Sequence, residues 1–149
     1  MKGDPVPDPD HVLRYVGGNH IENGEINGSG LLRRSNETHP SVNWLERFSG
    51  DLEDRVAEVR RRRRLTYGAT ARLAYLNVGH AKTYVLQNDP NSRRITVIQD
   101  PLDEDRERGF PEDPSHSLIE GVPGVDTPEG ELIGDLLAKC ILDSFSARG

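Results

Sequence analysis

The clearest periodicity in the first half of the chain runs from Trp44 to Val59. Its apolar residues recur at intervals of three or four positions, which places them along one stripe of a helix. They are Leu45, Phe48, Leu52, Val56 and Val59. Ser49-Gly50-Asp51 interrupts the stripe, and the Asp51 side chain can cap a new first turn. We therefore expect a bent helix or two short helices in sequence.

A second helix is predicted near the end of the chain. Thr127 offers a capping hydroxyl, and Pro128 stands at the first helical position. The apolar residues that follow at helical spacing are Ile133, Leu136, Leu137, Cys140, Ile141 and Phe145. We expect this stripe to cover one face of a sheet.

Short stretches rich in β-branched and aromatic residues predict the strands. They cover residues 11–16, 25–26, 72–78, 82–86, 94–98 and 117–119. The strands and helices do not alternate regularly as they do in βαβ units. The pattern therefore predicts an α+β fold, with a small, largely antiparallel sheet and two principal helical segments packed on it.

The length of 149 residues is typical of one domain. Residues 1–10 contain three prolines and three aspartates and almost nothing apolar. Such a segment buries too little surface to offset its ordering entropy, so we predict a flexible N-terminal arm. Residues 11–149 are predicted to form a single α+β domain, in which the charged, proline-rich stretch 99–114 is a surface loop.

Composition narrows the expected environment of the protein. No apolar run approaches the roughly 18–20 residues that span a bilayer, and the N-terminal residues do not resemble a signal peptide. We therefore expect a cytoplasmic protein without a membrane segment. Cys140 is the single cysteine and lies on the apolar face of the second helix. We predict a buried packing residue there rather than a reactive nucleophile.

The net charge of −6 is unevenly distributed. Residues 55–94 carry ten Lys and Arg against two acids, whereas residues 100–135 carry twelve acids against Arg106 and Arg108. Each region could face an external partner of opposite charge, or the two could face each other within the fold. We favour the internal or solvated arrangement.

The common signatures of cofactor and metal sites do not occur in the chain. GxxxxGK[ST], GxGxxG, GxSxG, HExxH and a CxxC pair are all absent. The five histidines, at positions 11, 20, 39, 80 and 116, show no helical i, i+4 spacing of metal ligands. We therefore predict neither a cofactor nor a metal site.

Polar residues near the predicted strand and helix ends form the candidate site, because functional sites are usually built where elements end. The candidates are His11, Arg14, Glu46, His80 and His116. A histidine would act as general acid or base, and Arg14 would hold an anionic group. In a strand His11 and Arg14 point to opposite faces, which weakens a joint role.

The string Ser41–Glu46 joins a short extended segment to the first predicted helix. Asn43 can cap that helix and Glu46 can reach back to its amide, while Trp44 is assigned to the core. The strings DHVLRY (10–15) and SVNWLE (41–46) resemble those of small bacterial proteins of uncharacterised function. The likeness also touches residues 115–121. This resemblance implies neither a fold nor an activity for the chain.

Arginines 60–64 suggest contact with nucleic acid, since clustered arginine binds phosphate. Arg61, Arg62 and Arg63 are the candidates for this role. Five consecutive helical residues point all round the axis, however, and no aromatic platform lies among them. We favour a solvated helix end.

The absence of a strong catalytic motif favours a non-catalytic protein-interaction component of a bacterial multi-component system, with a protein partner. The alternative is a small transferase or hydrolase that acts on a nucleotide or phosphorylated substrate through the five candidate residues above. Convergence of those side chains in one concave pocket would favour the enzyme. Their dispersal together with an exposed apolar patch would favour the interaction component.

Overall fold

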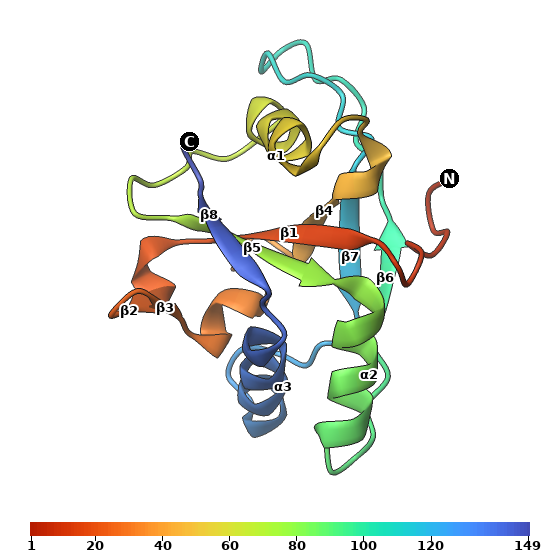
Figure 1. Cartoon of the computed structure of the whole chain (residues 1–149), viewed down its shortest axis with the longest axis vertical. Helices are drawn as coiled ribbons and strands as arrows, with labels where there is room; N and C mark the ends of the chain where they lie inside the picture. The colour runs from red at the N-terminus through yellow and green to blue at the C-terminus, as the bar shows by residue number, and fades with distance from the viewer.

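A six-stranded antiparallel sheet forms the centre of the molecule in the computed structural model, which describes residues 1–149 (Figure 1). From one edge to the other its strand order is β6-β7-β4-β1-β5-β8. The strands are β1 (His11–Val16), β4 (Ser41–Trp44), β5 (Arg72–Asn77), β6 (Thr96–Gln99), β7 (His116–Glu120) and β8 (Asp143–Ser146). A separate ribbon pairs β2 (Ile21–Glu22) with β3 (Glu25–Ile26). The predicted α+β class and antiparallel sheet are confirmed.

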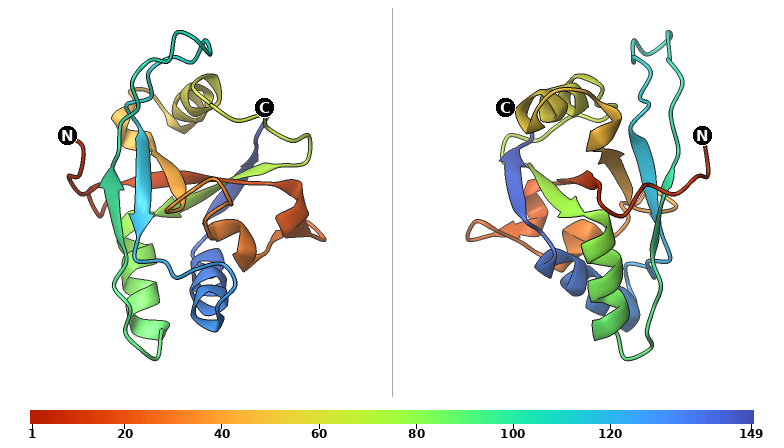
Figure 2. Two further views of the ribbon diagram at one scale, coloured as in Figure 1. Left: turned by 180° about the vertical axis from the view of Figure 1, so that it is seen from behind. Right: turned by 45° about the vertical axis from the view of Figure 1, so that its right-hand side comes forward.

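Helices cover both faces of the sheet. The helix α1 (Leu52–Arg61) lies on one face, and α2 (Val78–Asn88) and α3 (Pro128–Lys139) lie on the other (Figures 1 and 2). Three short 3-10 helices complete the fold: η1 (Gly18–His20), η2 (Gly28–Leu31) and η3 (Leu45–Arg47). None of the helices combines the length and the hydropathy that a membrane-spanning segment needs.

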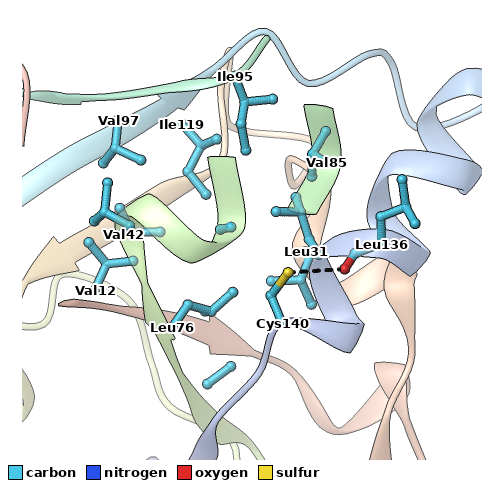
Figure 3. Close-up of a cluster of buried hydrophobic side chains, with 14 of the residues drawn as sticks. Val12, Leu31, Val42, Leu76, Val85, Ile95, Val97, Ile119, Leu136 and Cys140 are labelled. Atoms are coloured by element: carbon cyan, nitrogen blue, oxygen red, sulfur yellow. Dashed lines mark hydrogen bonds between the residues drawn. The ribbon is translucent and has the colours of Figure 1, made fainter. Parts of the chain in front are cut away.

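Each face of the sheet carries its own hydrophobic core. The core on the α2 and α3 side contains 17 buried residues, and the core on the α1 side contains 9. Figure 3 shows the larger core, to which strand residues such as Val12 and Val42 contribute together with Leu136 and Cys140. The Cys140 Sγ donates to the Leu136 carbonyl at 3.4 Å, and burial raises the pKa of the thiol to about 11. Cys140 is thus a packing residue.

Local capping signals start two helices where they were predicted. Thr127 Oγ1 accepts a hydrogen bond from the Gly130 N–H at 3.0 Å, and Pro128 stands in the first turn of α3. Asp51 accepts a hydrogen bond from the Asp54 N–H at 2.9 Å and begins α1. The predicted stripe is therefore divided into the short η3 and the longer α1.

The strand predicted over residues 82–86 is wrong, because this segment belongs to α2. Asn77 Oδ1 accepts a hydrogen bond from the His80 N–H at 2.8 Å, which caps the helix. The buried stripe that follows consists of Val78, Ala81 and Val85. Capping and the burial of this stripe outweigh the β preference of Thr83 and Tyr84. The fold therefore has a third helix.

The last predicted helix ends at Lys139 rather than continuing to residue 145. Phe145 lies in β8, directly opposite Leu73 of β5. The Leu142 N–H donates to the Tyr75 carbonyl at 2.8 Å. Hydrogen bonding to β5 therefore replaces the helix that the spacing of apolar residues predicted.

Residues 1–10, predicted as a flexible arm, lie beside the edge strand β6 (Figure 1). The Val6 N–H donates to the Val97 carbonyl at 2.9 Å, and the Gly3 N–H donates to the Gln99 carbonyl at 2.8 Å. Val6 is buried in the larger core. Val6, in the middle of the segment, therefore holds residues 1–10 against the sheet.

The segment between β6 and β7 rises beside α1 as a hairpin-like arm (Figure 2). Arg64 donates to the carbonyls of Asp103 and Pro111 in this arm, and Arg62 donates to the carbonyl of Glu112. The basic end of α1 and the acidic stretch thus lie side by side, and the arginines contact its backbone carbonyls rather than its carboxylates.

Candidate functional site

A pocket of about 110 Å³ lies on the α1 side of the sheet, between the sheet, the end of α1 and the arm that links β6 to β7. Its lining is rich in arginine and tyrosine, so we call it the arginine–tyrosine pocket. The lining side chains that matter here are Tyr15, Arg34, Asn43, Arg63, Arg64, Tyr67, Asp113 and His116.

Strand register brings three of these residues onto one face. In β1, Leu13 and Tyr15 point to the α1 side because side chains alternate along a strand. Leu13 lies opposite Asn43 of β4, and Asn43 lies opposite His116 of β7. Directly opposed residues share a face, so Tyr15, Asn43 and His116 all face α1.

Two arginines enclose a pair of stacked tyrosines. The Tyr15 and Tyr67 ring centroids are 4.8 Å apart, with an interplanar angle of 18°. The guanidinium carbon of Arg34 lies 5.6 Å from the Tyr15 centroid, and that of Arg63 lies 5.2 Å from the Tyr67 centroid. Burial raises the pKa of Tyr67 to about 12, so its hydroxyl stays protonated at neutral pH. Cation–π contact holds both arginines at the pocket.

The arginines of the pocket are incompletely neutralised. Arg34 Nη2 pairs with Glu37 at 2.9 Å, while its Nη1 is buried without a hydrogen-bond partner. Burial and the nearby charge of Arg14 lower the pKa of Arg34. Arg63 forms no ion pair, and its guanidinium lies over the Tyr67 ring. Arg64 donates to neutral backbone carbonyls.

Asp113 is the single carboxylate in the lining, and both of its oxygens accept hydrogen bonds from neighbouring residues. Asn43 Nδ2 donates to its Oδ2 at 3.0 Å, and Ser115 Oγ donates to its Oδ1 at 2.7 Å. The Ser115 N–H donates to Oδ1 as well, at 3.1 Å. Asp113 is only 5% exposed. It therefore fixes the pocket wall through neutral donors and forms no ion pair with a guanidinium.

His116 has a defined tautomer in this pocket. Its Nδ1 lies 2.8 Å from the Asp100 carbonyl and 3.2 Å from the Asp100 carboxylate. Because a carbonyl can only accept, Nδ1 carries the hydrogen. In the neutral ring the Nε2 lone pair is then free to accept a proton or a hydrogen bond.

His11 and Glu46 form a pair of their own away from the pocket. His11 Nδ1 lies 2.6 Å from Glu46 Oε2, and the His11 N–H donates to Glu46 Oε1 at 2.7 Å. The His11 ring stacks on Tyr75 with a centroid distance of 4.9 Å. The capping box predicted for Asn43 and Glu46 is wrong, since Asn43 lies in β4 and both side chains bind elsewhere.

Arg14 and His80 lie on the opposite side of the sheet from His116. Arg14 is 1% exposed and donates to both carboxylate oxygens of Glu37. His80 lies in the first turn of α2, where its ring approaches Tyr84. The five predicted residues thus do not converge, and the structure brings together only His11 and Glu46.

The three arginines considered for nucleic acid diverge. Arg61 is exposed and pairs with Glu58 at 2.9 Å. Arg62 pairs with the same carboxylate and lies over the Phe48 ring. Arg63 lies over Tyr67 at the pocket. Together they form no continuous basic stripe, because α1 ends at Arg61.

Sequence reasoning missed Arg34, Tyr67 and Asp113 as site residues. The three resembling strings contain four other lining residues, Tyr15, Ser41, Asn43 and His116, but none of the three missed residues lies in them. Nowhere in the structure do three His, Cys, Asp or Glu side chains gather as metal ligands would. Comparisons with protein-family models, curated proteins and solved structures find no match.

Proposed function

We propose that this protein binds the phosphate group of a phosphorylated small molecule in the arginine–tyrosine pocket. The observation that carries the proposal is the charge balance of the lining. Arg63 and Arg64 have no carboxylate partner, and Asp113 is held by Asn43 and Ser115. Planar guanidinium groups match phosphate oxygens in geometry as well as in charge.

The size of the pocket limits what enters it. A volume of about 110 Å³ is small, since pockets that enclose a whole small molecule usually measure about 300–1,000 Å³. A phosphate group fits this space, whereas a whole nucleotide does not. The rest of the ligand would lie outside the pocket, and Arg63, which is exposed at the rim, would contact the phosphate.

His116 is the acid–base group of the proposed site. Its Nε2 accepts a proton from a ligand hydroxyl or a protonated phosphate oxygen, while Asp100 holds the ring through Nδ1. This arrangement supports the transferase or hydrolase alternative. Arg63 would replace Arg14 as the residue that binds the anion, since Arg14 is buried on the other face. The prediction of a protein-interaction component stays a prediction.

Isothermal titration tests the proposal with inorganic phosphate, AMP and adenosine. We expect phosphate and AMP to bind and adenosine not to bind. Replacement of Arg63 by Gln should weaken AMP binding roughly 10- to 100-fold, the usual effect of losing a hydrogen bond to a charged group. The matched control is Arg61→Gln, which removes an exposed charge of the same cluster that does not line the pocket.

Three results would count against phosphate binding. These are no heat with either anion, equal binding of adenosine and AMP, or an equal loss of affinity in both arginine variants. The last result would indicate attraction by net charge alone. Thermal unfolding of the two variants should match that of the parent protein, because neither side chain is buried.

A further inference from the structure

A second concave surface lies on the other side of the sheet, along the junction of η2 and α3. One hollow of about 650 Å³ opens between the β2–β3 ribbon, the end of α3 and β8. Another, of about 400 Å³, continues past η2. The two share Asn27, Gly28 and Asp135. We call the combined surface the η2–α3 groove.

Apolar side chains are exposed at both ends of the groove. Leu142 is 56% exposed at one end, and Val125 is 42% exposed at the other. Ile26 and Ile141 line the first hollow between them and are partly buried against the larger core. Apart from Met1, Leu142 and Val125 are the most exposed large apolar residues of the chain. Both are available for contact with another molecule.

The polar lining of the groove is predominantly acidic. Its carboxylates come from the β2–β3 ribbon, α3 and β8, and they are Glu25, Glu131, Asp135 and Asp143. None of them forms an ion pair within the chain, and Lys139 is the single basic residue of the lining. Unpaired carboxylates beside exposed apolar groups favour a ligand that is both basic and apolar.

The floor of the groove is closely packed. Gly28 and Gly134 bring η2 and α3 into backbone contact, because a Cβ on Gly134 would lie 2.6 Å from the Gly28 carbonyl oxygen. A preformed surface loses little conformational entropy when it binds. Close packing of this kind favours a groove that is already formed before a partner binds.

We infer that the η2–α3 groove binds a basic segment of a partner protein, with apolar side chains of that segment packed on Leu142 and Val125. The acidic lining would repel an anionic lipid surface. A second copy of this chain is disfavoured, because each copy carries a net charge of −6 and the two would repel each other. The inference is independent of phosphate binding, since the two sites lie on opposite faces of the sheet.

Selection from a library of displayed random dodecapeptides tests the inference on the immobilised whole protein. We expect the enriched peptides to carry several Lys or Arg residues and at least two large apolar residues. Fluorescence anisotropy of the synthesised peptides should show at least tenfold weaker binding to Leu142→Asp and to Asp135→Lys. Glu53→Lys, at an exposed position of α1 outside the groove, is the control and should bind the peptides unchanged.

Several outcomes would overturn the inference. They are a lack of enrichment, enrichment of acidic peptides, or peptides whose affinity is equal for the parent and both groove variants. Self-association that disappears in Leu142→Asp would assign the groove to a second copy of the chain instead. Leu142 and Asp135 are exposed, so both variants should fold, and thermal unfolding verifies this.

Discussion

Arg14 is a fully buried cation that connects β1 to the loop before β4. It donates to both oxygens of Glu37, at 3.0 and 3.1 Å. It also donates to the backbone carbonyls of Gly30, Leu32 and Ser41. A charge at this depth is tolerated only when it is paired and hydrogen-bonded throughout. Arg14 is thus a structural residue, which explains why it does not serve as the anion clamp.

Glu37→Gln should lower the stability of the protein and change its dependence on pH, which tests the structural role of Arg14. Burial alone would raise the pKa of Glu37, but hydrogen bonds and charge from Arg14, together with Arg34, hold the pKa below its ordinary value. The ionised carboxylate therefore stabilises the fold above its unfolded-state pKa, and this stability is lost as the pH falls through the lower folded-state pKa. Loss of the buried pair should cost about 3–5 kcal/mol at neutral pH.

Urea unfolding at pH 7, 5 and 3 measures both effects. The stability of Glu37→Gln should depend less on acidity than that of the parent protein, because the titrating carboxylate is gone. Glu58→Gln is the control. Its pKa is also lowered, by hydrogen bonds from Arg61 and Arg62, but the pair is exposed and contributes little. Equal losses in the two variants would contradict a structural role for the buried pair.

At the scale of elements, η2 and α3 approach each other so closely that their backbones are in contact. Gly134 lies in the middle of α3, where alanine would normally favour the helix by about 1 kcal/mol. Here the added methyl group would meet the Gly28 backbone. Gly134→Ala should therefore destabilise the protein by roughly 1–3 kcal/mol, as overpacking does.

Thermal and urea unfolding of Gly134→Ala test this expectation. Lys139→Ala, at an exposed position of the same helix, should stay within about 0.5 kcal/mol of the parent. A stabilised Gly134→Ala protein would show that α3 is free to move away from η2. The same variant should also weaken peptide binding to the η2–α3 groove, because the floor would shift.

Elements with local signals could be predicted from sequence, and elements decided by tertiary contacts could not. Thr127 and Pro128 specify the start of α3 through their own backbone chemistry. The β-branched and aromatic residues of β1 likewise predict a strand from their composition alone. In contrast, β8 exists because Leu142 and Phe145 meet β5, a contact that lies far away in sequence. Helical spacing alone predicted a longer helix there.

In the candidate site, too, local signals could be predicted and tertiary contacts could not. His116 was identified as a candidate, but its neighbours Asn43 and Tyr15 depend on the registers between β7, β4 and β1. Sequence does not reveal these registers. Choosing Arg63 rather than Arg14 as the anion-binding residue required knowing that both terminal nitrogens of Arg14 donate to the buried Glu37 carboxylate. Residue types were thus predictable, whereas their convergence was not.

For the molecule as a whole, both edges of the sheet are protected. Residues 3–6 pair with β6 through the Val6 and Gly3 N–H groups. At the other edge, Arg72 Nη2 donates to the Ser144 carbonyl at 2.8 Å, and Arg60 donates to the Ser146 carbonyl. Covered edges do not pair with other molecules, which prevents edge-to-edge aggregation.

Val6→Asp should expose the β6 edge. The substitution removes a buried side chain whose burial contributes about 1.5–3 kcal/mol, and it places a carboxylate in the larger core. We expect lower stability and concentration-dependent aggregation, measured by light scattering at fixed ionic strength. Pro7→Ala, at an exposed neighbouring position, should leave both unchanged. A monodisperse Val6→Asp protein would contradict a protective role of residues 1–10.

The central position of β1 determines when the sheet can form during synthesis. β1 leaves the ribosome first, yet its neighbours β4 and β5 follow much later. The pairing of β5 with the edge strand β8 forms later still, because it includes the hydrogen bond from the Ala147 N–H to the Ala71 carbonyl. Long-range pairing of this kind folds slowly and leaves apolar strands uncovered in the nascent chain. A chain stalled before residue 143 would therefore be a natural target for chaperones that bind unpaired strands.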